Sequence, residues 1–312
     1  MLLDLLKILL FPGLFFLLSY AFVLEFVDRK AYARMQNRMG PPWYQPLADF
    51  LKLIGKKVII PHNAGKLMFA ALPVISLAAV ITAFVCVPVW GSSAAIVFEG
   101  DLVVALYLLT IPTMCLFLAG FSSHDVYTIM GAFRTLTQMF AYEVPLFIAF
   151  LSPAILAGTW SMTGILAFYA AHPLYTLINL PAFFIALLCA QSKLERAPFD
   201  APEAETEIVG GALVEYSGRH LAFMRASASC ELAVIASVVA ALFLPYVTGT
   251  GWLDFLFYLV KTLALVLLLA LLRASVARIR MDQMVRFCWR VMTPVALVQI
   301  IVNLFLRGGL GL

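Results

Sequence analysis

The sequence predicts an all-α polytopic membrane protein, and three features of it carry that prediction. Of its 312 residues, 63% are hydrophobic and only 12% are charged, whereas soluble domains average about 25% charged residues. Apolar stretches long enough to cross a bilayer, which takes roughly 20 residues each, recur along the chain. The basic residues gather in alternate loops. We therefore expect one membrane domain over residues 1–312, with eight transmembrane helices and one amphipathic interfacial helix.

Eight apolar stretches qualify as transmembrane helices. They cover about residues 3–26, 68–90, 101–121, 135–158, 173–191, 229–247, 254–272 and 290–306. No small-residue cleavage site follows the first stretch, so we expect it to be retained as a span.

The distribution of Lys and Arg orients these spans. The loops at about 27–67, 122–134, 192–228 and 273–289 hold 18 of the 21 basic residues, with Arg290 counted at the edge of the last. The alternate loops, at about 91–100, 159–172 and 248–253, hold none. Because basic loops stay on the cytoplasmic side, we expect the four basic loops to be cytoplasmic, both termini to lie outside, and the protein to reside in the inner (cytoplasmic) membrane.

The first cytoplasmic loop contains the expected interfacial helix. From Pro46 to Ile60, apolar residues recur at helical spacing and lysines occupy the opposite face, which is typical of a helix that lies in the membrane plane. Gly40-Pro41-Pro42 breaks the chain before it. On chemistry alone, a basic anchor for the membrane surface explains the loop as well as a functional role does.

Two charged residues fall well inside expected spans, away from the ends of those spans. Glu143 lies nine residues past Arg134, which is about 13 Å along a helix. A carboxyl group at that depth is costly, so it indicates a functional site unless it is a hydrogen-bonded structural group. Lys261 is either a residue that extends to the outer surface beside Asp254 or a second functional charge.

The stretch Gln191–His220 holds six of the 17 acidic residues. We expect a helix that starts after Pro202, is capped by Asp200, and carries Glu203, Glu207 and Glu215 near one face. Like charges at that spacing raise one another's pKa, as a proton relay requires. A solvated acidic loop would have the same composition, but residues 208–214 are apolar or small, which favours burial.

Other common sites have little support. The five cysteines form no C-x-x-C pair, and the four histidines have no partner at i+4, so no metal site is expected. The chain has no glycine-rich phosphate loop and no feature of nucleic-acid binding. The arginine-rich loop at 273–289 fits an acidic partner or anionic lipid headgroups.

Three motifs resemble the subunit 1 family of respiratory complex I, known in bacteria as the H subunit, and its relatives in membrane-bound energy-converting hydrogenases. They are Asp28-Arg29-Lys30 through Gly40-Pro41 with Gln45-Pro46-Leu47-Ala48-Asp49, then Tyr142-Glu143-Val144-Pro145, and Pro198-Phe199-Asp200 through Glu215-Tyr216-Ser217-Gly218. The resemblance implies a membrane anchor for a peripheral redox arm, without a redox centre of its own. It also implies a path of acidic groups towards antiporter-like subunits.

Carried over residue by residue, the resemblance assigns roles to two groups. Candidates for the acidic path are Glu143, Asp200, Glu203, Glu205, Glu207 and Glu215. Candidates for the interface with the redox arm are Arg29, Arg34, Arg38 and Asp49. The family tends to place a Glu ten residues after the Tyr-Ser-Gly turn, where this chain has Ala228. Glu231, one helical turn on, is a possible substitute.

The short loop between Gly40 and Gln45 is more similar to the hydrogenase branch. We therefore expect partners that are hydrogenase large and small subunits with NiFe and Fe–S centres, antiporter-like membrane subunits, and lipid. The ion moved is H⁺ or Na⁺. A quinone-site subunit of complex I is the alternative, with quinone as cofactor, and a free-standing secondary ion transporter is a third.

Overall fold

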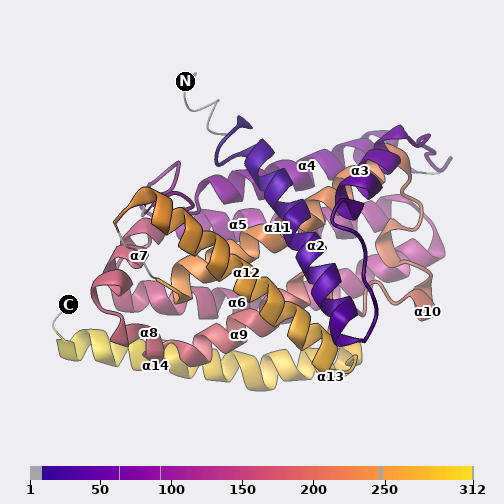
Figure 1. Ribbon diagram of the computed structural model, residues 1–312. Helices are drawn as coiled ribbons and strands as arrows, with labels where there is room; N and C mark the ends of the chain where they lie inside the picture. The colour runs from indigo at the N-terminus through magenta and orange to yellow at the C-terminus, as the bar shows by residue number, and fades with distance from the viewer. Residues whose placement is uncertain (1–8, 63, 92, 246–248, 311–312) are drawn as a thin grey trace.

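The computed structural model describes residues 9–310 apart from 63, 92 and 246–248, and these residues form an α-helical bundle without a named strand (Figure 1). The side chains of residues 205, 206, 309 and 310 are outside the description. The helices are α2 (Leu14–Met35), α3 (Gln45–Gly55), α4 (Lys66–Val85), α5 (Asp101–Ser122), α6 (Val126–Ala157), α7 (Met162–Ala171), α8 (Leu174–Ile178), α9 (Leu180–Lys193), α10 (Glu205–Ile208), α11 (Gly218–Phe243), α12 (Gly251–Ser275), α13 (Met281–Phe287) and α14 (Thr293–Leu310), with a 3-10 turn at Gly211–Leu213 and a π turn at Cys288–Met292.

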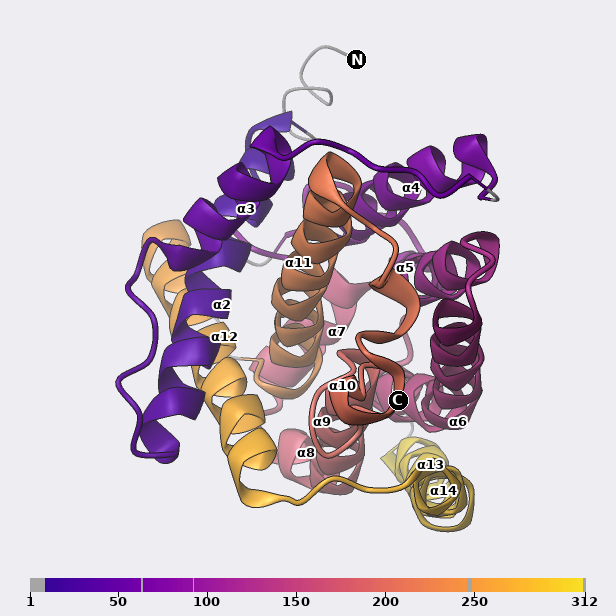
Figure 2. The ribbon, with the colours of Figure 1, turned by 90° about the vertical axis from the view of Figure 1, so that its right-hand side faces the viewer.

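Helix α11 is the centre of the bundle. Figure 2 shows it surrounded by α2 and α12 on one side and by α4, α5, α6 and α9 on the other. From Ala226 to Phe243 every residue except Ala228 is buried. The sequence of α11 is rich in Ala and Ser, and small residues let neighbouring helix backbones approach closely within a membrane. Groups that α11 carries are therefore held away from water and lipid.

Among the described residues, six helices are long and apolar enough to cross a membrane. They are Lys66–Val85, Asp101–Ser122, Val126–Ala157, Gly218–Phe243, Gly251–Ser275 and Met281–Gly308. These correspond to six of the eight expected spans. The expected first span begins in residues outside the description, and its described helix runs on to Met35. The expected fifth span is divided into α8 and α9, so it is not one continuous helix.

The division of the fifth span occurs at a buried polar network. Asn179 lies between α8 and α9, and Pro181 takes one of the first positions of α9, where a missing N–H is tolerated. The Asn303 amide of α14 donates to the Asn179 side chain and to the carbonyl and hydroxyl oxygens of Ser152 in α6, all at 2.8 Å. Gln299 and Tyr169 complete this amide network. It fastens α14 across α6 and α9.

Two further expectations about elements were wrong. The loop expected at 159–172 contains a helix, α7, because its ten residues are apolar and start after Ser161. The interfacial helix expected to reach Ile60 ends at Gly55 instead. Residues 56–60 are not helical, because they pack against the turn at Ser217-Gly218, where the Ser217 hydroxyl accepts from the Ile59 N–H at 2.9 Å. A Cβ on Gly218 (φ +59°) would lie 2.7 Å from the Lys56 carbonyl oxygen, so this contact requires glycine.

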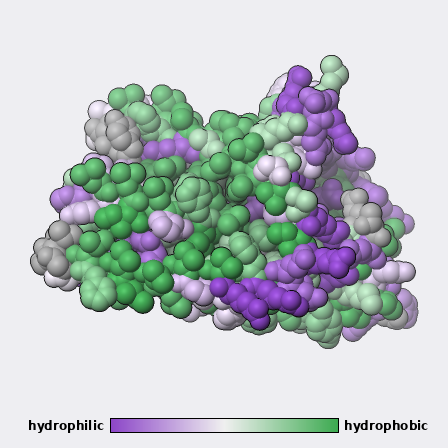
Figure 3. All heavy atoms as spheres, turned by 90° about the horizontal axis from the view of Figure 1, so that it is seen from below, coloured by the Kyte–Doolittle hydropathy of each residue, from purple (hydrophilic) through white to green (hydrophobic). Residues whose placement is uncertain are grey.

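Hydrophilic side chains collect at one end of the molecule. Figure 3 shows an apolar surface over most of one face and a hydrophilic surface at the right, which is the end where α3, α10 and α13 lie in Figure 1. We call this the charged end. It brings together the two long motifs at residues 28–49 and 198–218, although these are distant in sequence.

Candidate functional site

The acidic stretch does not form the expected helix. Helix α10 covers only Glu205–Ile208 and is followed by the 3-10 turn Gly211–Leu213. Gly211 has φ +66°, and a Cβ there would lie 2.2 Å from the Pro202 carbonyl oxygen. Helix α10 has already ended at Ile208, since Val209 has a φ of +64°, and the backbone then folds back at Gly211. Glu215 therefore lies beyond a turn rather than on the Glu207 face.

Asp200 and Glu207 are held by arginines, not by each other. Asp200 Oδ1 lies 2.9 Å from Arg278 Nε, and Glu207 lies 2.5 Å from Arg134 Nη1 and 3.6 Å from Arg278 Nη2. The expected cap is also absent, because Ala204 precedes α10 and Asp200 faces Arg278. The hydrogen bond and charge of Arg134, with the charge of Arg278, lower the pKa of Glu207. The expected mutual rise in pKa was therefore wrong for this residue.

The other acids of the stretch have different surroundings. Glu203 is exposed and Glu215 is half-buried. The charge of Glu203 acts on Glu195 and Arg196, which belong to the loop after α9. The side chain of Glu205 lies outside the described residues. The structure thus brings Asp200 and Glu207 together at Arg278. Glu203 instead interacts electrostatically with Glu195 and Arg196.

A second charged group is built on α2. Asp28 is 1% exposed, and its Oδ2 lies 2.9 Å from Arg196 and 3.5 Å from Arg273. The Arg273 guanidinium also covers the ring of Tyr32 at 4.4 Å. The Asp-Arg-Lys motif of α2 is therefore joined directly to the loop after α9 and to the end of α12. Next to Arg196, burial and the charge of Glu203 raise the pKa of Glu195 to about 8.

The residues expected at a redox-arm interface divide into two sets. Arg29 forms ion pairs with Glu25 and with Asp49, the latter at 3.1 Å, so it ties α2 to α3. Arg34 and Arg38 are exposed at the charged end or near it. Glu25, which the sequence did not single out, also accepts a hydrogen bond from Ser229 of α11 at 2.6 Å.

A third charged group consists of Lys193 at the end of α9 and Glu231 on α11. They are 4% and 6% exposed, and Lys193 Nζ lies 2.9 Å from Glu231 Oε1. The lysine also donates to the carbonyl oxygen of Leu109 and to the Thr113 hydroxyl at 3.3 Å. Thr113 in turn lies 3.2 Å from the Tyr142 hydroxyl. A buried ion pair is thus surrounded by hydrogen-bonding groups from α5 and α6.

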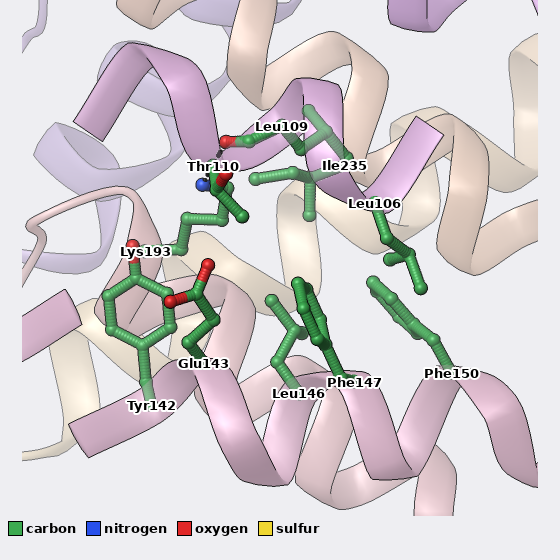
Figure 4. A pocket seen from close by; sticks show the side chains of 10 residues that line it. All are labelled: Leu106, Leu109, Thr110, Tyr142, Glu143, Leu146, Phe147, Phe150, Lys193 and Ile235. Atoms are coloured by element: carbon green, nitrogen blue, oxygen red, sulfur yellow. Dashed lines mark hydrogen bonds between the residues drawn. The ribbon is translucent and has the colours of Figure 1, made fainter. Parts of the chain in front are cut away.

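Glu143 faces this ion pair across a small pocket. Leu106, Leu109, Thr110, Tyr142, Glu143, Leu146, Phe147, Phe150, Lys193 and Ile235 line it. Figure 4 shows the Glu143 carboxyl group pointing towards the Lys193 side chain, with the apolar residues closing the other end. Glu143 is half-buried. Sequence reasoning found Glu143 but not Lys193, since the fifth span was expected to stop at residue 191 and α9 continues to Lys193.

Glu231, the expected substitute for a carboxylate at position 228, lies in surroundings that differ from those of position 228. Ala228 is exposed, whereas Glu231, one turn on, is buried against Lys193. The two positions face different surroundings, so the acidic group of this chain is directed to α9 and α5. Lys261, the other intramembrane charge, lies on α12 and lines a separate pocket with Asp254 and Tyr258.

Comparisons with known proteins identify the scaffold. Residues 7–304 match the NADH dehydrogenase family. The NADH-quinone oxidoreductase H subunit from Frankia casuarinae is 33% identical, over 92% of this chain and 69% of that protein. Its counterpart from Syntrophotalea carbinolica is 32% identical, over 92% and 91%. A chain of the membrane-bound sulfane sulfur reductase, an archaeal respiratory membrane complex, superposes with a TM-score of 0.85 at 28% identity, over 97% and 98% of the two chains. The chain therefore belongs to the NADH dehydrogenase family, together with the H subunits of NADH-quinone oxidoreductases.

Proposed function

We propose that this chain is the membrane anchor and coupling subunit of a complex I-like respiratory assembly. It links electron transfer in a peripheral arm to the movement of H⁺ or Na⁺ through neighbouring antiporter-like subunits. In this proposal the charged end faces the cytoplasm and receives the peripheral arm, with Arg34 and Arg38 exposed for that contact. Helix α3 lies along the membrane surface, where its exposed Leu47, Leu51 and Ile54 meet lipid.

The observation that carries the proposal is a series of ionisable groups that starts at the charged end and extends to α9, α11 and α6. It begins with the Asp200, Glu207, Arg134 and Arg278 group, continues through Asp28 and Arg196, and ends at Lys193, Glu231 and Glu143. Ionisable groups inside a membrane protein are costly and mark ion or proton pathways. Their mutual interaction is strong there because the effective dielectric constant is low.

Coupling requires that the electron-transfer states interact differently with this series. A change of charge in the peripheral arm near the charged end alters the energies of the Asp28 and Asp200 groups, and each deeper group responds to the one before it. The effect equals the difference in interaction free energy between the two states. The chain needs no redox centre for this task. Among the described residues, no three His, Cys, Asp or Glu side chains gather as a metal site.

We further propose that the electron-transfer partner is a hydrogenase module, with a NiFe centre and Fe–S clusters in its large and small subunits. The short Gly40–Gln45 loop supports this choice. The second candidate is a quinone-reducing assembly, which the names of the relatives favour. Purification of the intact complex, identification of its subunits, and assays of H₂ evolution and quinone reduction separate the two. Quinone reduction without H₂ evolution would contradict the hydrogenase assignment.

The role of the series is tested with Glu143→Gln in the intact complex, reconstituted into vesicles. We expect the ratio of ions moved to electrons transferred to fall towards zero, because the amide keeps the side chain's size but cannot carry the proton. The matched control is Glu99→Gln, which changes an exposed glutamate outside the series. A Glu143→Gln complex that moves ions at the ratio of the control would contradict the proposal.

A further inference from the structure

Two carboxyl groups lie near Lys193, but only one of them is in direct contact with it. Its ammonium lies 2.9 Å from Glu231, while Glu143 lines the same pocket from the opposite helix, α6 (Figure 4). Both acids are thus available to one cation, from two different helices that pack against α9. Among the described side chains, Lys193 is paired with Glu231 and forms no ion pair with Glu143.

The contact with Glu231 is a charge pair rather than a well-formed hydrogen bond. Although Nζ is near, Oε1 of Glu231 accepts no hydrogen bond of ordinary geometry from the described residues. The lysine's hydrogen bonds go to Leu109 and Thr113 on α5. A buried carboxylate has about four acceptor positions. Oε1 of Glu231 is therefore held mainly by the charge of Lys193, at 2.9 Å, which a second carboxylate could take over.

Electroneutrality limits the charge states of the three groups. An unpaired carboxylate is costly in the membrane interior, so one ammonium supports one ionised carboxyl group and the other carboxyl group keeps its proton. When Lys193 pairs with Glu231, the proton resides on Glu143. When the lysine pairs with Glu143, the proton resides on Glu231. The net charge is zero in both arrangements, and one proton has moved from Glu143 to Glu231.

We propose that Lys193 is a mobile positioning residue that exchanges Glu231 for Glu143 as its partner, and by doing so moves a proton between the two carboxyl groups. This inference rests on the proposed coupling function, since it gives the deepest step of that relay. The Tyr142 ring, whose centroid is 5.8 Å from Nζ, and the Thr113 hydroxyl also face the lysine, and both are neutral. Glu195, two residues along the chain, also interacts electrostatically with the lysine, and the exchange does not involve its proton.

The first test is structural and independent of ion movement. In the intact complex carrying Glu231→Gln, cryo-EM is expected to show Lys193 Nζ within about 4 Å of the Glu143 carboxylate, the distance of an ion pair. Infrared spectra are expected to lose the signal of a protonated carboxyl group that disappears in Glu143→Gln. A Lys193 that stays beside Gln at position 231, with the protonated signal intact, would overturn the inference.

The second test separates a mobile lysine from a structural ion pair. The double variant Lys193→Met with Glu231→Leu removes both charges, so it leaves no unpaired buried ion and is expected to assemble. Electron transfer is then retained and ion translocation is lost. If this variant moves ions normally while Glu143→Gln does not, the relay through Glu143 stands and the role of Lys193 is refuted. If both move ions normally, the proposed function itself is refuted.

Discussion

Two buried polar regions of this bundle hold their helices together by different means. The amide network of Ser152, Asn179, Gln299, Asn303 and Tyr169 is neutral, and its amide donors reach several acceptors at 2.7–3.2 Å. The region of Lys193, Glu231 and Glu143 carries ions, and among the described residues one of its carboxylate oxygens accepts no ordinary hydrogen bond. The first region is a fixed joint between α6, α9 and α14. In the second region, one lysine has two carboxyl groups as alternative partners.

This difference has a physical cause. A neutral network in which each group is bonded has no lower-energy arrangement nearby, so it specifies one packing. A cation between two carboxyl groups has two arrangements of similar charge, and an external charge selects between them. A buried polar group alone thus does not indicate function in a membrane protein. A buried ion with more than one available partner is the better indicator.

The largest expected effect comes from breaking the ion pair on one side. Glu231→Leu removes the carboxylate that lies 2.9 Å from the buried Lys193 ammonium. Loss of one member of a buried pair typically costs about 3–5 kcal/mol, and pairing of the lysine with Glu143 is expected to offset only part of that loss. We expect low assembly and a lower melting temperature in detergent. Lys193→Met with Glu231→Leu is expected to recover most of that loss. A Glu231→Leu protein as stable as wild type would show that the pair is not desolvated.

A smaller effect is expected in the amide network. Asn303→Leu removes the amide that donates to Ser152 and Asn179, and it leaves buried acceptors with one donor fewer. Such a loss costs about 1–3 kcal/mol of unfolding free energy, measurable as a lower melting temperature. The ratio of ions moved to electrons transferred is expected to stay at its wild-type value. A change in that ratio would erase the distinction between the two regions.

The sequence predicted the class of the fold because hydrophobicity and charge bias are sums over many residues, which local errors do not alter. It also singled out Glu143, since an acid within an apolar span stands out. It did not predict Lys193 or Glu25 as site residues. Their partners lie on α11, and the packing of α9 and α2 against that helix is tertiary structure, which local sequence patterns do not reveal. The helix expected through Glu207 and Glu215 does not form, because the chain leaves the helix at Val209 and folds back at Gly211, where a Cβ would lie 2.2 Å from the Pro202 carbonyl oxygen.

The ionisable groups at the charged end and those further in also differ in how their acids are paired. At the charged end, Asp200 and Glu207 each have an arginine within 3 Å. Each of these acids is held by an ion pair. Further in, the Asp28 carboxylate is shared by two cations, Arg196 and Arg273. Glu195 lies between the two regimes, beside Arg196 and two residues from Lys193.

The smallest predicted effect is a pH dependence that originates at Glu195. Its pKa is raised from an ordinary 4.5 to about 8 by burial and by the charges of Glu203 and Glu231, which outweigh the opposing charge of Lys193. The folded protein therefore binds more protons than the unfolded chain between these two values, so the contribution of Glu195 to stability falls as pH rises from about 4.5 to 8 and stays low above that. Glu195→Gln removes this dependence. Melting temperatures of the wild type and the variant, measured from pH 5 to 9, are expected to diverge with rising pH, the variant becoming the more stable. Parallel curves would place Glu195 in water and outside the buried series.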